Sequence, residues 1–359
     1  MSGRRVLITG LATYWGGRLA QALEGFEQVE TIIGVDSRDP TRELERTEFV
    51  RVGTQHSLLQ RIVRAAEIDT VVDARLMVSS VTAPPRVTHE NNVIGTMNIL
   101  AACSGGDSPV RKFVFKSSAH YYGAHEDDPA FFAEEMSRPH PPRTALERDI
   151  VEADDAVRDF AAKSPEIEVT VLRCANVLGP DVDTVFTRMF SLAAVPMVLG
   201  FDPRVQFVHE DDIVHALEHA TVHSAPGVFN VAADGVLALS EAIGLLGKLA
   251  LPILPPWGTG LVAGPLRRAG LKIPDEIWGL LRFGRGLDNR AYKATGFEYG
   301  YTAREAVLRF GEHLRLSPVL GGVEHGYTYE REVEEFLRWS PHVRRERTGA
   351  EADREPLGI

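Results

Sequence analysis

The chain has 359 residues, 44% of them hydrophobic and 25% charged, a composition typical of a globular protein with one large core or two modest ones. Its 39 basic and 50 acidic side chains give a formal charge of -11, which argues against nonspecific binding to nucleic acids or to anionic lipid surfaces. The two cysteines, Cys103 and Cys174, are too few for a disulfide framework or a CxxC metal site, and they fit a protein of the reducing cytoplasm.

Short runs of Val, Ile and Leu alternate with longer helical patterns from residue 4 to about residue 172. The apolar runs are RVLIT, TIIGVD, TVVDA, KFVFKSS and VTVLR, and the helical patterns cover residues 15–23, 89–103 and 144–162. Continuously apolar strands are buried on both faces, and their alternation with helices is typical of parallel strands joined by crossover helices. We therefore predict an α/β fold with a doubly wound parallel sheet.

The first strand runs directly into the segment TGLATYWGGRLAQAL, so we expect no signal peptide before it. Gly10 permits a sharp turn, and Gly16 lets the start of a helix approach a pyrophosphate, whose charge the helix dipole favours. Thr13 replaces the middle glycine of the usual pattern, and Tyr14 and Trp15 follow it. The segment predicts a dinucleotide-binding turn, although strand-to-helix turns also use glycine for packing alone.

The second strand ends at Asp36, 26 residues after Gly10. A carboxylate here can accept both hydroxyl protons of an adenosine ribose and repel a 2′-phosphate, which favours NAD over NADP. Ser37 adjoins this site, and Arg38 is close enough to weaken the preference by pairing with a phosphate. Alternatively, Asp36 only starts the turn DSRDP.

The pattern becomes less regular after residue 176. A mixed stretch precedes the strand-like VQFVH, a helix over about 211–222 and the strand-like VFNVA, and the pattern after residue 240 is helical and rich in proline. We predict a Rossmann domain over 1–175 with its sheet completed by about 204–235, a smaller substrate domain over 176–203 and 236–340, and a disordered tail over 341–359. Prolines and glycines interrupt the uncharged stretch 249–266, so we expect an apolar loop region there and no membrane span, with a monotopic membrane contact as the alternative.

Several segments, taken in order, resemble the extended short-chain dehydrogenase/reductase family, in particular its NAD-dependent epimerase/dehydratase branch typified by UDP-glucose 4-epimerase. These segments are IDTVVDA, NNVIGTMNIL, FVFKSSAHYYG, VTVLRCANVLGP, QFVHEDDIVHAL and GVFNVAADG. The resemblance covers roughly residues 4 to 315. It implies NAD as the cofactor, a nucleotide sugar as the substrate, and a homodimer formed through the helices at 89–103 and 144–162.

The resemblance also assigns roles to single residues. Asn92 matches the asparagine that orders the active site, and Ser118 matches the serine that hydrogen-bonds the reacting hydroxyl group. Ala74 and Ser117 would line the nicotinamide side, and Asn176 falls where relatives contact the diphosphate or the sugar of the substrate. Each of these residues also has a structural interpretation, because asparagines and serines commonly bond to nearby backbone.

The family's chemistry depends on a YxxxK pair, in which the lysine lowers the pKa of the tyrosine so that a phenolate can take the substrate proton. None of the six lysines of this chain has a tyrosine four residues before it. Alignment places Thr144 at the tyrosine position and Arg148 at the lysine position, 26 residues after Ser118 in the case of Thr144. Thr144 cannot form a phenolate, and Arg148 can bind the nicotinamide ribose but stays protonated.

Three interpretations of this altered site stay open. A displaced general base, among His120, Tyr121, Tyr122 and His140, would keep the protein an epimerase, a dehydratase or another oxidoreductase or isomerase, and His120 and Tyr122 would then also contact substrate. Loss of the base would leave a noncatalytic NAD(H)-binding sensor or scaffold. A reductase of a steroid-like or lipid-linked substrate is the third interpretation, with the substrate held by the apolar region 249–281.

A metal site is the remaining possibility that we considered. Asp211, His215, His219 and His223 recur every four residues on one predicted helix and share a face. A solvated histidine face explains the same spacing, so we expect no metal.

Overall fold

The structure is a computed structural model that describes residues 3–53, 55–81, 83–253 and 273–316. Met1–Ser317 form one compact unit. The predicted tail over 341–359 and the part of the apolar stretch that follows residue 253 lie outside the described residues.

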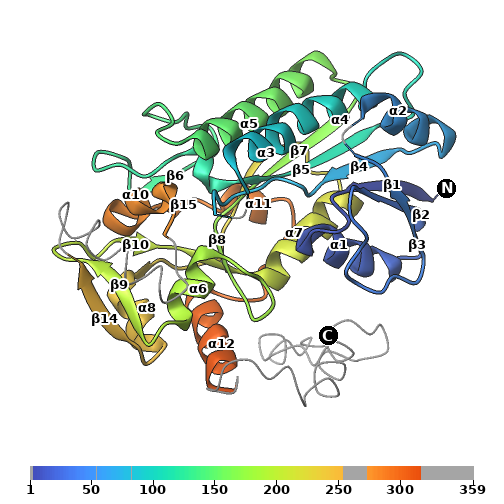
Figure 1. Cartoon of the computed structure of the whole chain (residues 1–359). Coiled ribbons are helices and arrows are strands. Elements are labelled where there is room, and N and C mark those ends of the chain that lie inside the picture. The colour runs from blue at the N-terminus through green and yellow to red at the C-terminus, as the bar shows by residue number, and fades with distance from the viewer. Residues whose placement is uncertain (1–2, 54, 82, 254–272, 317–359) are drawn as a thin grey trace, which may run out of the picture. The chain divides into compact units, whose positions relative to one another are not determined.

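Seven parallel strands form the central sheet, in the order β12-β7-β5-β4-β1-β2-β3 (Figure 1). The strands are β1 (Arg4–Thr9), β2 (Val29–Asp36), β3 (Thr47–Arg51), β4 (Thr70–Asp73), β5 (Lys112–Ser118), β7 (Glu168–Cys174) and β12 (Gly227–Val231). The doubly wound parallel sheet predicted from the sequence is confirmed. Because the strand order reverses between β1 and β4, a crevice for ligands is expected at the carboxyl ends of these strands.

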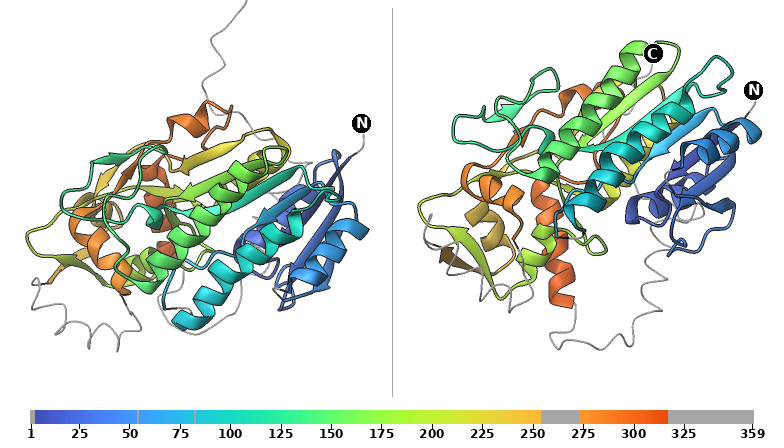
Figure 2. Two further views of the ribbon diagram at one scale, coloured as in Figure 1. Left: turned by 90° about the horizontal axis from the view of Figure 1, so that it is seen from above. Right: turned by 45° about the horizontal axis from the view of Figure 1, so that its top comes forward.

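Helices cover both faces of this sheet (Figures 1 and 2). One face carries α2 (His56–Ala65), α3 (Pro85–His89), the π-helical turn η1 (Glu90–Ile94), α4 (Gly95–Cys103) and α5 (Ala145–Lys163), and the other carries α1 (Tyr14–Glu24) and α7 (Glu210–Val222). The short 3-10 turn η2 (Ala119–Tyr121) follows β5 directly. Val6, Phe113 and Val114 are fully buried between these layers, as expected for strands that pack on both faces.

A second hydrophobic cluster is built from segments on both sides of β12 in the chain, and it includes the buried Phe190, Phe207 and Leu239. Its elements and their neighbours are β6 (Phe131–Phe132), β8 (Asn176–Leu178), α6 (Val185–Ser191), β9 (Ala194–Val198), β10 (Arg204–Val205), β11 (Phe207–His209), β13 (Leu237–Ala238), α8 (Leu239–Leu245), β14 (Leu249–Ile253), α10 (Asp275–Phe283), β15 (Gly286–Leu287), α11 (Arg290–Lys293) and α12 (Ala303–Leu316). The domain boundary near residue 175 stays a prediction.

Two strands differ from the sequence expectations. β3 was not predicted, because it is an edge strand with mostly exposed residues and its sequence TEFVR has no continuous apolar run. The region after residue 240 was predicted to be helical, yet it contains β14, which pairs in parallel with β9. Pro252 disfavours a helix in this segment. The backbone groups of β14 therefore form hydrogen bonds with β9 instead of within a helix.

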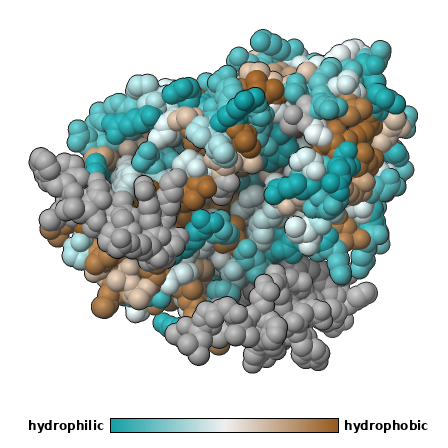
Figure 3. Space-filling view, in the orientation of Figure 1, coloured by the Kyte–Doolittle hydropathy of each residue, from teal (hydrophilic) through white to brown (hydrophobic). Residues whose placement is uncertain are grey.

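Exposed hydrophobic side chains gather on the pair β9 and β14, at the lower left of Figure 3. Leu199, Leu249 and Leu251 are 52%, 75% and 39% exposed. Within the described parts of the chain, no helix has the length and apolar character needed to cross a membrane.

Candidate active site

The turn after β1 closes around two glycines. Gly10 has a φ of +84°, which favours glycine, and a Cβ atom at Gly16 would lie only 2.1 Å from the carbonyl oxygen of Gly10. Thr13 caps α1: its hydroxyl group accepts a hydrogen bond from the Gly16 amide at 3.1 Å and donates one to the Gly10 carbonyl at 2.7 Å. Thr13 therefore replaces the usual middle glycine without opening the turn.

The first turn of α1 presents open backbone donors to a cavity. The amides of Tyr14 and Trp15 have no hydrogen-bond acceptor among the described residues, whereas the next two amides bond to Thr13. Both residues line the cavity. Unpaired amides at a helix N-terminus are a suitable site for a pyrophosphate.

Asp36 lies at the carboxyl end of β2, beside this helix start. Its carboxylate accepts hydrogen bonds from the Ala12 amide and the Arg38 amide, each at 3.1 Å. Ser37 donates a longer bond to the same carboxylate, at 3.4 Å. The bonds hold the Asp36 side chain at the cavity wall, where a ribose diol would be expected.

The cavity has a volume of about 1050 Å³ and joins these groups along the edge of the sheet. The predicted cofactor residues that line it are Thr13, Tyr14, Trp15, Asp36, Ser37, Arg38 and Ala74. Gly10 and Gly16 lie in the turn beneath it. The open amides, the Asp36 carboxylate and the size of the cavity fit an adenine dinucleotide.

Arg75 also lines this cavity and was not predicted from the sequence. Its guanidinium group is ion-paired with the buried Asp73 at 2.9 Å and donates to the Asn91 carbonyl at 3.3 Å. A basic residue two positions after a fully buried strand was the available signal.

A smaller cavity of about 140 Å³ adjoins the first, because Trp15 and Asp183 line both. The predicted residues Ser117, Ser118, His120 and Asn176 all line it. Further residues that line it were not predicted as site residues: Lys116, Cys174, Arg188 and Arg285. The carboxyl end of β5 thus brings the proposed serine to a pocket beside the proposed cofactor cavity.

The sequence profile of the NAD dependent epimerase/dehydratase family matches residues 6–232, more than half of the chain. The chain belongs to this family. Its cofactor, NAD, is therefore the one that Gly10 and Asp36 predict. The fold and the family predicted from the sequence motifs are both confirmed.

Three similar proteins illustrate the range of this family. Uncharacterized protein Rv0501 of Mycobacterium tuberculosis is 33% identical over 327 residues, which cover 88% of this chain and 85% of that protein. The N-acetyl-alpha-D-glucosaminyl-diphospho-ditrans,octacis-undecaprenol 4-epimerase of Escherichia coli O157:H7 is 27% identical over 176 residues, 48% of this chain and 49% of that protein. The crystal structure of UDP-glucuronic acid 4-epimerase from Bacillus cereus in complex with NAD has a TM-score of 0.65 at 16% identity, covers 87% of this chain and 96% of that one, and shows a common fold.

Asn92 supports the loop that follows β4. Its side-chain amide accepts a hydrogen bond from the Met77 amide and donates one to the Met77 carbonyl, each at 2.8 Å. The residue is fully buried in η1, and Met77 lines the larger cavity. Asn92 therefore orders the cavity wall through Met77.

Thr144 and Arg148 lie outside both cavities. Thr144 is the N-cap of α5, where its hydroxyl group accepts a hydrogen bond from the Glu147 amide at 3.1 Å. Arg148 is exposed on the same helix. The structure does not bring these two residues together with Ser118, and their catalytic and cofactor roles stay predictions.

Tyr121 and Tyr122 are buried in the core. The Tyr122 hydroxyl group donates to Asn230 and accepts from Arg173, both at 2.9 Å, and the Tyr121 hydroxyl group accepts from Arg158 at 3.0 Å. Neither tyrosine lines the smaller cavity. Both hydroxyl groups therefore have hydrogen-bond partners within the protein.

His120 lines the smaller cavity, but its surroundings disfavour a proton. Burial lowers the pKa of His120 to about 3, with a contribution from the cationic Arg285 and Arg138. Its imidazole is therefore neutral at pH 7 and a weak base.

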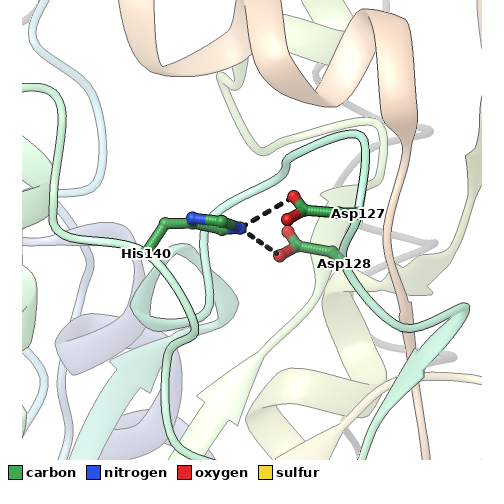
Figure 4. A group of neighbouring side chains, drawn as sticks. All are labelled: Asp127, Asp128 and His140. Atoms are coloured by element: carbon green, nitrogen blue, oxygen red, sulfur yellow. Dashed lines mark hydrogen bonds and ion pairs between the residues drawn. The ribbon is translucent and has the colours of Figure 1, made fainter.

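His140 lies outside both cavities, among acidic side chains (Figure 4). Its Nε2 atom is 2.8 Å from Asp127 Oδ1 and 3.8 Å from Asp128 Oδ1. In the part of the chain that the structure describes, Asp127, Asp128 and His140 form a group whose possible metal-ligand atoms all lie within 4.8 Å of one another. On α7, by contrast, Asp211 is paired with Arg18.

Proposed function

We propose that this protein is an NAD-dependent enzyme that oxidises and reduces a hydroxyl-bearing carbon of a nucleotide sugar, as an epimerase or a dehydratase, with a rearranged proton acceptor. The observation that carries the proposal is the junction of the two cavities at Trp15. It would place a dinucleotide along the sheet edge next to a small pocket that contains Ser118.

The residues around the larger cavity would each bind one part of NAD. The amides of Tyr14 and Trp15 would bind the pyrophosphate, and Asp36 would accept the hydroxyl groups of the adenosine ribose. When bound, NAD supplies reversible oxidation of the substrate carbon. The Ser118 hydroxyl group would hydrogen-bond the reacting oxygen of the substrate, since it lies at the strand end that faces the junction.

Cationic groups of the smaller cavity support an anionic substrate. Burial lowers the pKa of Arg285 only to about 10, so this guanidinium group stays charged at neutral pH. It donates to the Gly123 carbonyl at 2.8 Å, and Arg188 is ion-paired with Asp183. Arg285 is thus a positive charge that forms no ion pair with a carboxylate of the described residues, which suits a diphosphate.

Bound dinucleotide and turnover test the proposal separately. Mass spectrometry and ultraviolet absorbance of the purified protein should detect NAD, and calorimetry should show saturable binding to protein stripped of it. The protein should then interconvert UDP-glucose and UDP-galactose, or form a reduced cofactor that absorbs at long wavelength with one of a panel of UDP- and dTDP-sugars. Binding of NAD without any turnover across the panel would favour the noncatalytic sensor or scaffold.

A lipid-linked sugar is the second candidate substrate. Leu249 and Leu251 of β14 and Leu199, directly after β9, are exposed and form an apolar surface that a lipid chain could contact. Turnover of an undecaprenyl-diphosphate sugar in detergent, but not of the matching UDP-sugar, would select this candidate.

We also propose that the protein forms a homodimer through α4 and α5. Ile94 and Met97 are 44% and 43% exposed where η1 continues into α4. They are three residues apart, which puts them on one side of this helical segment, and α4 packs against α5. A second copy of this surface would bury them.

A further inference from the structure

Lys116 is a buried lysine in the smaller cavity. It lies on β5 two residues before Ser118, so the two side chains point to the same face of the sheet. Lys116 is only 3% exposed, and it lines the cavity together with Ser118 and Cys174. A charged residue in a strand with seven buried positions is unusual.

The amine of Lys116 has no polar partner among the residues that the structure describes. Its nearest charge-related contact is the indole ring of Trp15, whose centre lies 4.8 Å from Nζ. Lys112, on the same face of the same strand, differs: its amine is 3.0 Å from the Glu168 carboxylate and donates to the His223 carbonyl. The cost of burying a charge is therefore offset at Lys112 by the Glu168 carboxylate, whereas no described residue offsets it at Lys116.

The other groups around the cavity do not supply a counter-ion. On β7, the neighbouring Cys174 is a neutral thiol, because burial raises its pKa. His120, in η2, is neutral, and Arg285 adds a positive charge. Among the described residues that line the cavity, the one carboxylate belongs to Asp183, and it is already paired with Arg188.

An amine in such surroundings loses its proton easily. Burial lowers the pKa of Lys116, because the ammonium form gives up hydration without gaining an anion. Neutral lysine has a lone pair and acts as a base in enzymes.

We propose that Lys116 is the proton acceptor of this site and fills the role that the absent tyrosine has in relatives. In the oxidation step, the O–H bond of the substrate breaks and its proton moves to Lys116 Nζ, while Ser118 hydrogen-bonds the oxygen. Oxidised NAD, when bound, would supply the two-electron acceptor for the hydrogen of the adjoining carbon, which balances the formation of the C=O bond. In the reverse step the ammonium group of Lys116 returns the proton. This role rests on the proposed function, which supplies the oxidant.

The protonation state of Lys116 can be measured without cofactor or substrate. Lysine labelled with ¹³C at the ε position gives six signals in this chain, and Lys116→Met identifies one of them. We expect the Lys116 signal to titrate at a lower pH than free lysine under the same conditions. A titration at or above that of free lysine overturns the proposal whether or not the enzyme is active.

Measurements of kcat distinguish a Lys116 that acts as a base from one that only supplies a positive charge. With UDP-glucose or UDP-galactose and NAD, Lys116→Met and Lys116→Arg should both lower kcat by about 10²- to 10⁴-fold, since a guanidinium group stays protonated. NAD affinity should change less than about threefold. Lys112→Met is the matched control, a buried lysine of the same strand, and it should lower stability while it retains kcat. Full activity of Lys116→Arg overturns the proposal, whereas an inactive wild type with a low Lys116 pKa means that the assumed substrate is wrong.

Discussion

The carboxylate of Asp36 accepts a hydrogen bond from the amide of Ala12, at 3.1 Å. This bond joins the end of β2 to the glycine turn and fixes the acidic group at the cavity wall. We expect Asp36→Ala to raise the Kd for NAD by about tenfold or more, because a charge-assisted hydrogen bond to the ribose contributes about 1.5–3 kcal/mol. It should also narrow the preference for NAD over NADP, since the repulsion of a 2′-phosphate is removed. Isothermal titration with both cofactors measures the two changes.

Asp39 offers a control for this variant in the same loop. Its carboxylate is 70% exposed and pairs with Arg51. Asp39→Ala should leave both dissociation constants unchanged. Equal effects of the two variants would show that the loop acts only through its net charge.

Arg173 and Asp154 form a fully buried ion pair between β7 and α5. Arg173 donates to both oxygens of Asp154, at 3.1 and 2.7 Å. Removal of one partner leaves the other charge buried, so Arg173→Met should lower the free energy of unfolding by about 3–5 kcal/mol. Arg158 contacts the same carboxylate but is 40% exposed, and Arg158→Met should cost less than about 1 kcal/mol. Urea denaturation of both variants provides the comparison, and similar losses would contradict this view of the pair.

The sequence predicts the elements that depend on local pattern. β1, β4 and β5 each contain a continuous apolar run, VLI, VV and FVF, because both of their faces are covered, whereas the edge strand β3 has mostly exposed residues and gives no such run. Gly10 and Asp36 were likewise found from their spacing, since a phosphate-binding turn is a local device.

Other features depend on tertiary contacts and escape such patterns. Arg285 is more than 150 residues from Ser118 in the chain, yet both line one cavity. Lys116 is visible in the sequence, but only the structure shows that it lacks the acidic partner that Lys112 has. The exposed position of Arg148 also could not be read from its spacing to Ser118, because helix rotation determines it.

The neutral imidazole of His120 predicts a loss of stability in mild acid. Its pKa is about 3 in the folded protein and near its ordinary value of 6.5 when unfolded, so the unfolded chain binds more protons between these values. Stability should therefore fall as the pH drops below 6.5, by about 2 kcal/mol at pH 5 from this group. His120→Gln should remove this part of the pH dependence in urea titrations. His223→Gln, at an exposed ring, should retain it, and an unchanged slope in His120→Gln would contradict the assigned environment.

Dimer formation through α4 can be tested at its most exposed apolar positions. Ile94 and Met97 are three residues apart and lie on one side of the helical segment, so a carboxylate at either position would meet its symmetry mate or an apolar partner surface. We expect Met97→Glu, and more so Ile94→Glu with Met97→Glu, to convert a dimer into a monomer in light scattering after size exclusion, with unchanged thermal unfolding at low concentration. Leu308 on α12 is 38% exposed, and Leu308→Glu should leave the dimer intact. Persistence of the dimer in the double variant would show that the interface does not include α4. Two buried carboxylates without cationic partners would destabilise a dimer formed there by more than its apolar contacts stabilise it.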